Sequence, residues 1–146
     1  MAKHIDHISR SAYLEIRRIS SIRHLLTRKA TAQLMYFFVL GCLDYCNSLL
    51  IDTTTDQMYR LQKIQKHAAK IVFRKADTSM LNNFSKKLHW LPVKERILFK
   101  IATFAFRFFG GTLPPYLSSC LSVYSPSRTL RSSSDEKKLK SFRRSR

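Results

Sequence analysis

Glycine and proline are scarce in this chain of 146 residues, which contains three glycines and four prolines. Both residue types interrupt helices, so their scarcity leaves long segments that can remain helical. Apolar residues make up 45% of the chain, enough for a hydrophobic core, and the length suits one domain. The sequence shows no strand-like alternation and no internal repeat. We therefore expect an all-α fold, a small bundle of about five helices.

Cysteine is scarce as well. The three cysteines, Cys42, Cys46 and Cys120, are odd in number and lack CxxC spacing, which disfavours a disulfide scaffold and favours a reducing, intracellular compartment. Cys42 and Cys46 are one helical turn apart, a spacing that suits half of a metal site. Because no pair of histidines at metal-binding spacing accompanies them, we expect no metal and no other cofactor.

Acidic residues are few, with 9 Asp and Glu against 27 Lys and Arg, a net charge of +18. Such an excess repels itself in a compact state, so a polyanionic partner is expected. Nucleic acid is the first candidate, and the surface of an anionic membrane is the alternative. The longest apolar run, residues 34–43, is about half of the roughly 20 residues that a membrane span needs, so no span is expected. The first ten residues do not resemble a secretory signal.

Helical periodicity and capping residues divide the first half of the chain. The segment 4–19 has one apolar face, made by Ile5, Ile8, Ala12, Ile16 and Ile19. Thr27 is the predicted N-cap of a second helix that runs to Cys46, and Asn47 and Ser48 mark its end. Thr54 and Gln57 have capping-box spacing and start a third helix that runs to about Arg74.

In the second half we expect a short helix at 79–88 and a fifth helix that starts near Pro92 and ends at Gly110 and Gly111. Pro114 and Pro115 open a last short helical turn. The predicted helical domain spans residues 1–121. The predicted basic tail, 122–146, is rich in Ser, Arg and Lys, and its composition predicts disorder.

Basic side chains form stripes at helical spacing. The third helix has two stripes, an apolar one and an uninterrupted basic one that consists of Arg60, Lys63, His67, Lys70 and Arg74. The basic stripe would extend along about 21 Å of helix, enough to follow several phosphates. A second basic row on the fifth helix consists of Arg96, Lys100 and Arg107. A third cluster, relieved only by Glu15, consists of Arg17, Arg18, Arg23, Arg28 and Lys29.

We interpret the first two rows as candidate nucleic-acid-binding residues that contact the sugar–phosphate backbone without reading bases. A solvated helix face is the alternative. The aromatic residues at helical spacing could stack on bases, but core packing is expected instead for Tyr36, Phe37, Phe38, Phe99, Phe104, Phe106, Phe108 and Phe109. Trp90 is expected to anchor the corner before the fifth helix.

The stretch LDYCNSLL, residues 43–50, places an acid and a thiol in an apolar run. General acid catalysis or a cysteine nucleophile would need a second carboxylate or a base held nearby, and the sequence supplies neither in this segment. We expect structural roles, in which Asp44 or Asn47 bonds to backbone or to a basic helix. The side chains expected to pack inward are those of Leu43, Cys46 and Leu50. No phosphate-binding glycine loop, GxSxG or HExxH occurs, so no catalytic residue and no small-molecule substrate are expected.

Four blocks of the sequence together resemble one family. They are LDYCNSLL (43–50), LQKIQKHAAKIV (61–72), LHWLPVKERILFKI (88–101) and YSPSRTLRSSS (124–134). In this order they resemble the region that follows the polymerase core in reverse transcriptases of animal non-LTR retrotransposons, of the LINE type found in Jockey and chicken-repeat elements. HIDHISRSAYLEIRRISSIRHLL (4–26) resembles the segment that enters the thumb of that enzyme.

The resemblance implies a truncated, thumb-like remnant of an RNA-directed DNA polymerase. The adjacent aspartates with which the family's palm holds two metal ions are absent, so the chain is not expected to be an enzyme on its own. Its implied partners are template–primer duplex and the palm of a separate or lost polymerase core, and its implied compartment is the nucleus. Two alternatives remain, a structural fragment without autonomous activity and a basic amphipathic binder of membrane surfaces.

Overall fold

A computed structural model of the chain describes residues 2–74, 87–124 and 139. The elements follow in the order α1 (Ala2–Ser21), α2 (Arg28–Leu34), the π-helix η1 (Met35–Leu40), α3 (Gly41–Asp44), the 3-10 helix η2 (Asn47–Leu50), α4 (Thr55–Phe73), α6 (Val93–Phe109) and α7 (Pro115–Ser118). Apart from an isolated bridge between Val123 and Leu139, the described part contains no β-structure. The all-α fold is therefore confirmed. The predicted helix at 79–88 and the predicted tail at 122–146 fall mostly outside the described residues.

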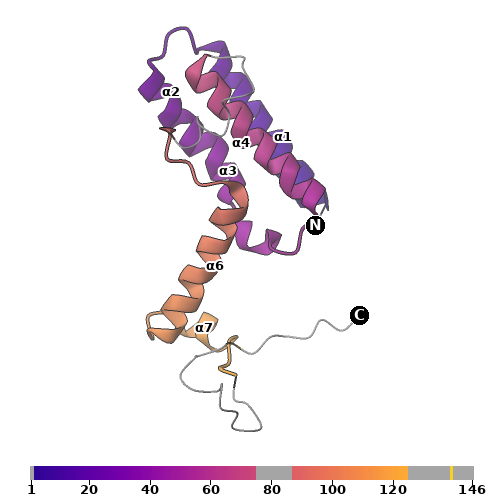
Figure 1. Ribbon diagram of the computed structural model, residues 1–146, viewed down its shortest axis with the longest axis vertical. Helices are drawn as coiled ribbons and strands as arrows, with labels where there is room; N and C mark the ends of the chain where they lie inside the picture. Colours follow the sequence, from indigo (N-terminus) through magenta and orange to yellow (C-terminus); the bar gives the residue numbers. More distant parts are fainter. Residues whose placement is uncertain (1, 75–86, 125–138, 140–146) are drawn as a thin grey trace. The chain divides into compact units, whose positions relative to one another are not determined.

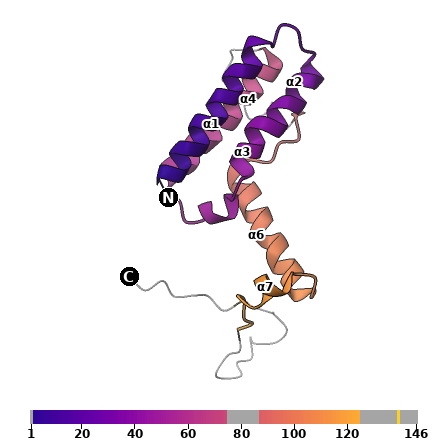
Figure 2. The same ribbon diagram turned by 180° about the vertical axis from the view of Figure 1, so that it is seen from behind.

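The chain divides into two compact units, Met1–Lys100 and Ile101–Arg146. In the first unit, α1, the run from α2 to α3, and α4 lie side by side (Figures 1 and 2). α1 and α4 point the same way, because Asp6 contacts Arg60 near their starts and Arg23, just after α1, bonds to Val72 near the end of α4. The intervening helical run returns the chain between them, which makes a three-helix bundle.

The apolar face predicted for the first helix is confirmed, since all five of its members are buried in the bundle. α4 contributes Leu61, Ile64 and Ala68 to the same core, as its apolar stripe predicts. Burial of these side chains is the main stabilising contribution to the unit. Gln65 is also fully buried on α4, which periodicity alone did not predict.

The second helix starts as predicted, with the Thr27 hydroxyl accepting a hydrogen bond from the backbone N–H of Ala30. It differs from the prediction in two ways. Residues 35–40 form a π-helix, and the helix ends at Asp44 rather than continuing to Cys46. Tyr45 is extended and Cys46 has a left-handed backbone with φ of 51°, so the helical register is lost before residue 46.

The prediction that the aromatic residues pack in the core was wrong. Five of the eight are exposed, with Phe37 and Phe106 at 71% and 79% exposure, and the other three are half-buried. In η1 the inward positions are taken by Met35, Val39 and Leu40. Since neighbouring residues in a helix point in different directions, the aromatics between these positions face outward.

α4 begins and ends with clear capping contacts. The Thr54 hydroxyl accepts a hydrogen bond from the N–H of Gln57 at 3.4 Å, which confirms the predicted N-cap. At the other end Arg74 is left-handed, with φ of 52°. The guanidinium of Arg23 donates hydrogen bonds to the carbonyl oxygens of Ile71 and Val72 at 3.0 and 2.9 Å. A cation at a helix C-terminus satisfies free carbonyls and complements the helix dipole.

Two glutamines of α4 hold the start of α6. Gln65 donates a hydrogen bond to the carbonyl of Leu91 at 2.9 Å, and its own amide oxygen accepts one from Gln62. Gln62 in turn accepts a hydrogen bond from the N–H of Val93, the first residue of α6. Trp90 is buried at this corner, as expected of an anchor. The polar network fixes where the chain turns into α6.

In the second unit, the remainder of α6 ends where the two glycines predict. Gly111 has a positive φ of +68°. The N–H of Thr112 donates a hydrogen bond to the carbonyl oxygen of Arg107, and the N–H of Gly111 donates one to the carbonyl oxygen of Phe108. This pattern is a Schellman motif, which needs a residue that tolerates left-handed backbone. α7 then starts at Pro115, as predicted, and Leu113 is buried.

Candidate nucleic-acid interface

The predicted basic stripe follows the outer side of α4. Arg60, Lys63, His67 and Arg74 are exposed, whereas Lys70 is half-buried. The ammonium group of Lys63 lies 4.7 Å from the centre of the Tyr59 ring, a cation–π contact that orients the side chain along the helix. Four of the five residues of the predicted basic stripe are therefore exposed along one face of α4.

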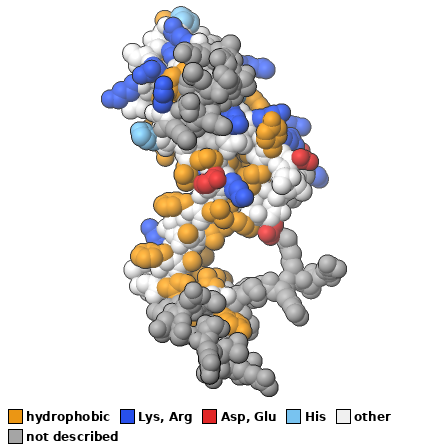
Figure 3. Space-filling model, viewed as in Figure 1, with side chains coloured by type: hydrophobic (Ala, Val, Ile, Leu, Met, Phe, Trp, Pro, Cys, Tyr) orange, Lys and Arg blue, Asp and Glu red, His pale blue; other side chains and the backbone are white. Residues whose placement is uncertain are grey.

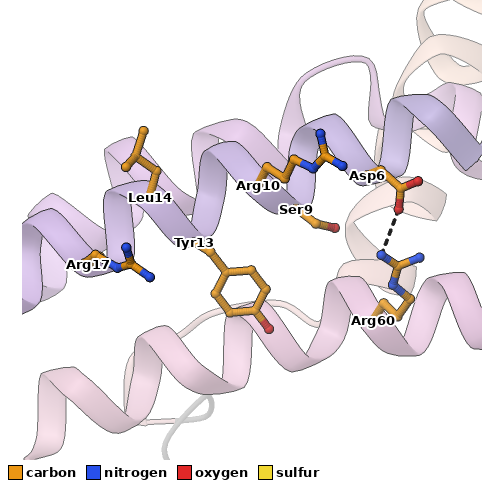
Figure 4. A pocket seen from close by; sticks show the side chains of 7 residues that line it. All are labelled: Asp6, Ser9, Arg10, Tyr13, Leu14, Arg17 and Arg60. Carbon is orange, nitrogen blue, oxygen red and sulfur yellow. Dashed lines mark hydrogen bonds and ion pairs between the residues drawn. The ribbon is translucent and has the colours of Figure 1, made fainter.

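The neighbouring helix α1 extends this row. Arg10 and Arg17 of α1 line the same groove as Arg60 of α4 (Figure 4). Tyr13 of α1 contacts His67 of α4, with ring centres 6.0 Å apart. We call Arg10, Arg17, Arg60, Lys63 and His67 the α1/α4 basic surface. From the sequence, Arg17 was predicted to belong to a different basic cluster, and Arg10 was not predicted as a contact. The spacing of residues 6, 10, 13 and 17 was the available signal, because these positions share one helix face.

The acid Asp6 also lies on this surface. Its carboxylate accepts a hydrogen bond from the Arg60 guanidinium at 2.8 Å, and the two side chains are 45% and 54% exposed. Exposed ion pairs add little stability, and their partners exchange readily with solvent or other ligands. The positive charge of Arg60 is thus partly neutralised by Asp6, but the guanidinium group remains accessible to an anionic ligand.

Arg96, which was predicted to contact nucleic acid from an exposed position, is instead largely buried. Its guanidinium forms a two-point ion pair with the carboxylate of Asp44, and only 13% of its side chain is exposed. Burial alone would lower the pKa of Arg96, but the hydrogen bond and charge of Asp44, together with Tyr36, outweigh it and raise the pKa. Because an internal acid holds this cation inside the first unit, we withdraw Arg96 from the candidate interface.

The other two residues of the second row are exposed but are not joined to the α4 stripe. Lys100 is the last residue of the first unit, and Arg107 belongs to the second unit. The carbonyl of Arg107 accepts the hydrogen bond that closes the end of α6. The predicted second row is therefore not a continuous basic face, since Arg96 turns inward from it.

The third basic cluster separates into individual contacts. Arg18 pairs with Glu15 at 2.7 Å, and Arg28 lies over the ring of Phe73 at 5.5 Å. The guanidinium group of Arg23 donates its hydrogen bonds to backbone carbonyls at the end of α4, and Arg74 donates a hydrogen bond to the carbonyl of Arg23. Burial, followed by repulsion from Arg74, lowers the pKa of Arg23. From this cluster only Arg17 lines the groove on α1.

The structure assigns structural roles to LDYCNSLL. Asp44 ties to the basic side chain of Arg96, which confirms one of the two expected roles, and Asn47 donates a hydrogen bond to Asp44 at 3.2 Å. Leu43 and Leu50 are buried as predicted. The inward placement of Cys46 was wrong, because its left-handed backbone exposes the thiol and leaves Asn47 in the buried position.

The surroundings of Cys42 favour the protonated thiol over the thiolate. Burial, with a further contribution from the Glu15 carboxylate, raises the pKa of Cys42, and the thiol donates a hydrogen bond to the carbonyl of Phe38. A nucleophilic or metal-binding cysteine needs the opposite, a stabilised thiolate. No group of three metal-ligating side chains occurs among the described residues.

Figure 3 shows Lys and Arg side chains spread over the three-helix bundle and hydrophobic side chains gathered over α6. No helix in the described ranges combines the length and the hydrophobicity needed to cross a bilayer. On the α1/α4 basic surface, two packed helices present basic side chains around one groove.

Comparison with known proteins adds no relative: no protein-family model, no curated protein and no solved structure matches the chain.

Proposed function

We propose that this chain is a thumb-like remnant of a non-LTR retrotransposon reverse transcriptase and that it binds the sugar–phosphate backbone of template–primer duplex without reading sequence. The proposal rests on the resemblance of its sequence blocks and on one structural observation. Two parallel, packed helices present a shared row of cations around an open groove, the α1/α4 basic surface. A polyanion bound there would relieve part of the net charge of +18.

The arrangement suits phosphates better than bases. The cations follow helix faces in a row, the geometry needed for successive backbone contacts. The chain would hold the duplex, while the chemistry of polymerisation would belong to a palm that lies outside it. On this proposal the chain is not an enzyme by itself.

A salt-dependent titration tests this function. The protein is titrated into fluorescent DNA duplex and RNA–DNA hybrid at several salt concentrations. Four of the five residues of the surface are Arg or Lys, so we expect similar affinity for both duplexes and a slope of log K against log salt of about −3.6. Micromolar or weaker binding with a slope that indicates one or two phosphates would contradict the proposal.

Charge-matched variants locate the binding surface. The double variant Arg60→Gln/Lys63→Gln removes two positive charges from α4, and Lys29→Gln/Lys94→Gln removes two exposed charges elsewhere in the first unit. We expect the α4 variant to lose at least about tenfold more affinity at moderate salt. Equal losses would show that net charge alone attracts the duplex.

A second candidate is a structural fragment that associates with itself or with a larger protein. The observation that favours it is the exposure of several large aromatic side chains, among them Phe37 and Phe38 on η1. Exposed apolar patches commonly mark interfaces. Sedimentation velocity at increasing concentration tests it, with Phe37→Ser/Phe38→Ser as the variant. A monomer at all concentrations, unchanged by the variant, would argue against this candidate.

A further inference from the structure

A groove of about 540 Å³ runs along α1 from Asp6 to Arg17 and is bordered on α4 by Arg60. It is lined by Asp6, Ser9, Arg10, Tyr13, Leu14, Arg17 and Arg60 (Figure 4). Arg10, Tyr13 and Arg17 are exposed, so the groove opens to solvent along one side. All of its residues belong to the first unit, in which the two helices are packed together.

Ser9 is the unusual member of this lining. It is only 7% exposed, and its hydroxyl oxygen is shielded from solvent and has no hydrogen-bond partner among the residues that the structure describes. Two serines at the end of α1 behave differently, since Ser20 and Ser21 donate their hydroxyls to backbone carbonyls of the preceding turn at 2.7 Å. A buried hydroxyl that forgoes this local bond is costly unless a ligand or water satisfies it. In Figure 4 the Ser9 side chain points into the space between the helices, toward the side on which Asp6 and Arg60 meet.

The charges around Ser9 favour an anion. Three arginines face the groove against one carboxylate, Asp6, which leaves a net charge of +2 from its lining. The planar guanidinium group presents paired N–H donors that match two oxygens of a phosphate. Asp6 holds Arg60 by an exposed ion pair, so a phosphate bound in the groove would compete with that carboxylate for the same guanidinium.

We propose that this groove is a seat for one phosphate group of a nucleic-acid backbone, in which the Ser9 hydroxyl and the guanidinium groups of Arg10 and Arg60 donate hydrogen bonds to the phosphate oxygens. Asp6 is the competing group that sets the affinity of the seat. The inference rests on the proposed function, because it identifies one position on the α1/α4 basic surface where the backbone is fixed by a neutral donor and not by charge alone. The rest of the surface then contacts phosphates through longer-range attraction.

Ser9→Ala is the decisive variant, since alanine is the best helix former and leaves the charge unchanged. We expect it to lower the affinity for a DNA duplex by about five- to tenfold with no change in the salt slope. Ser9→Thr keeps the hydroxyl and should keep most of the affinity. Arg10→Gln, in contrast, should reduce the magnitude of the salt slope by about 0.9, the value for one phosphate contact.

Asp6→Asn should act in the opposite direction. Removal of the competing carboxylate frees Arg60, so we expect duplex affinity to rise by about threefold or more. The control is Glu95→Gln, which also removes one exposed negative charge from the first unit but lies outside the groove. An equal rise in both variants would show a net-charge effect and overturn the role of Asp6. Circular dichroism melts check that every variant folds.

The outcomes separate the two proposals. Tight, salt-dependent duplex binding that Ser9→Ala and Asp6→Asn leave unchanged would overturn the phosphate seat and leave the proposed function standing. Absence of duplex binding by the unmodified protein would end the proposed function, and with it this seat for a backbone phosphate. A parallel calorimetric titration with inorganic phosphate distinguishes the source of the ligand. Phosphate binding that depends on Ser9, without any effect of Ser9→Ala on duplex binding, would identify a site for free phosphate and overturn the proposal.

Discussion

Arg96 and Asp44, separated by 52 positions in the chain, form a two-point ion pair that joins the start of α6 to the end of α3. Asn47 adds a hydrogen bond to the same carboxylate, and the Arg96 guanidinium lies 5.9 Å from the centre of the Tyr36 ring. A basic residue that helical spacing placed in a surface row thus serves to hold the first unit together. The acid in the LDYCNSLL stretch is a structural anchor.

Breaking this pair should destabilise the protein. Asp44→Asn leaves the largely buried Arg96 without its counter-charge, and we expect the free energy of unfolding to fall by about 2 kcal/mol. The figure is below that for fully buried pairs, because the Asp44 side chain is 36% exposed. Urea denaturation measures the change, with exposed Asp56→Asn as the charge-matched control. An unfolding free energy of Asp44→Asn equal to that of the unmodified protein would mean that the pair contributes nothing.

The buried glutamine of α4 should be needed for the position of α6. Gln65→Ala removes the donor to Leu91 and the acceptor of the Gln62 amide, and we expect a loss of about 1–3 kcal/mol. Hydrogen exchange adds a local readout, because the N–H of Val93 is held by Gln62 and should exchange faster in the variant. Unchanged protection at Val93 would show that packing alone positions the corner.

Cys46 adopts a left-handed backbone conformation, which glycine adopts more readily than other residues. Its φ of 51° lies in the left-handed region, which is unfavourable for residues with a Cβ atom. Cys46→Gly should therefore stabilise the protein by about 1 kcal/mol. Cys46→Ala is the matched control, since it also removes the exposed thiol but keeps the Cβ atom, and it should be close to neutral. If both variants have the same thermal midpoint, backbone strain at Cys46 is negligible.

The raised pKa of Cys42 should appear in its reactivity and in the pH dependence of stability. Because the folded state keeps the thiol protonated to higher pH than the unfolded chain does, its contribution to stability is complete below an unfolded pKa of about 8.5 and declines as the pH rises above it. Removing this group, as in Cys42→Ser, should flatten the alkaline decline. At pH 8 iodoacetamide should modify exposed Cys46 and Cys120 well before Cys42. Peptide mapping by mass spectrometry checks this, and faster labelling of Cys42 would contradict it.

Much of the secondary structure could be predicted, because local rules specify it. Thr27 and Thr54 cap the helices that follow them, since a hydroxyl reaches an N–H only three residues away. Gly111 ends α6 because its backbone tolerates positive φ. In the candidate interface, the exposed positions along α4 followed from helical spacing in the same way. Nothing in local spacing, however, distinguishes Lys63, which faces solvent, from Arg96, which meets Asp44.

By itself, the sequence determined the all-α class, the helix starts, the buried face of α1 and the basic stripe of α4, because each depends on residues within one or two helical turns. Only the tertiary structure decided the partner of Arg96, the exposure of Phe37 and Phe106, the burial of Gln65 and the unpaired hydroxyl of Ser9. These depend on which helices meet and in what register. Burial, charge pairing and hydrogen bonding of a side chain depend on the groups packed around it, and those groups come from residues that lie far apart in the chain.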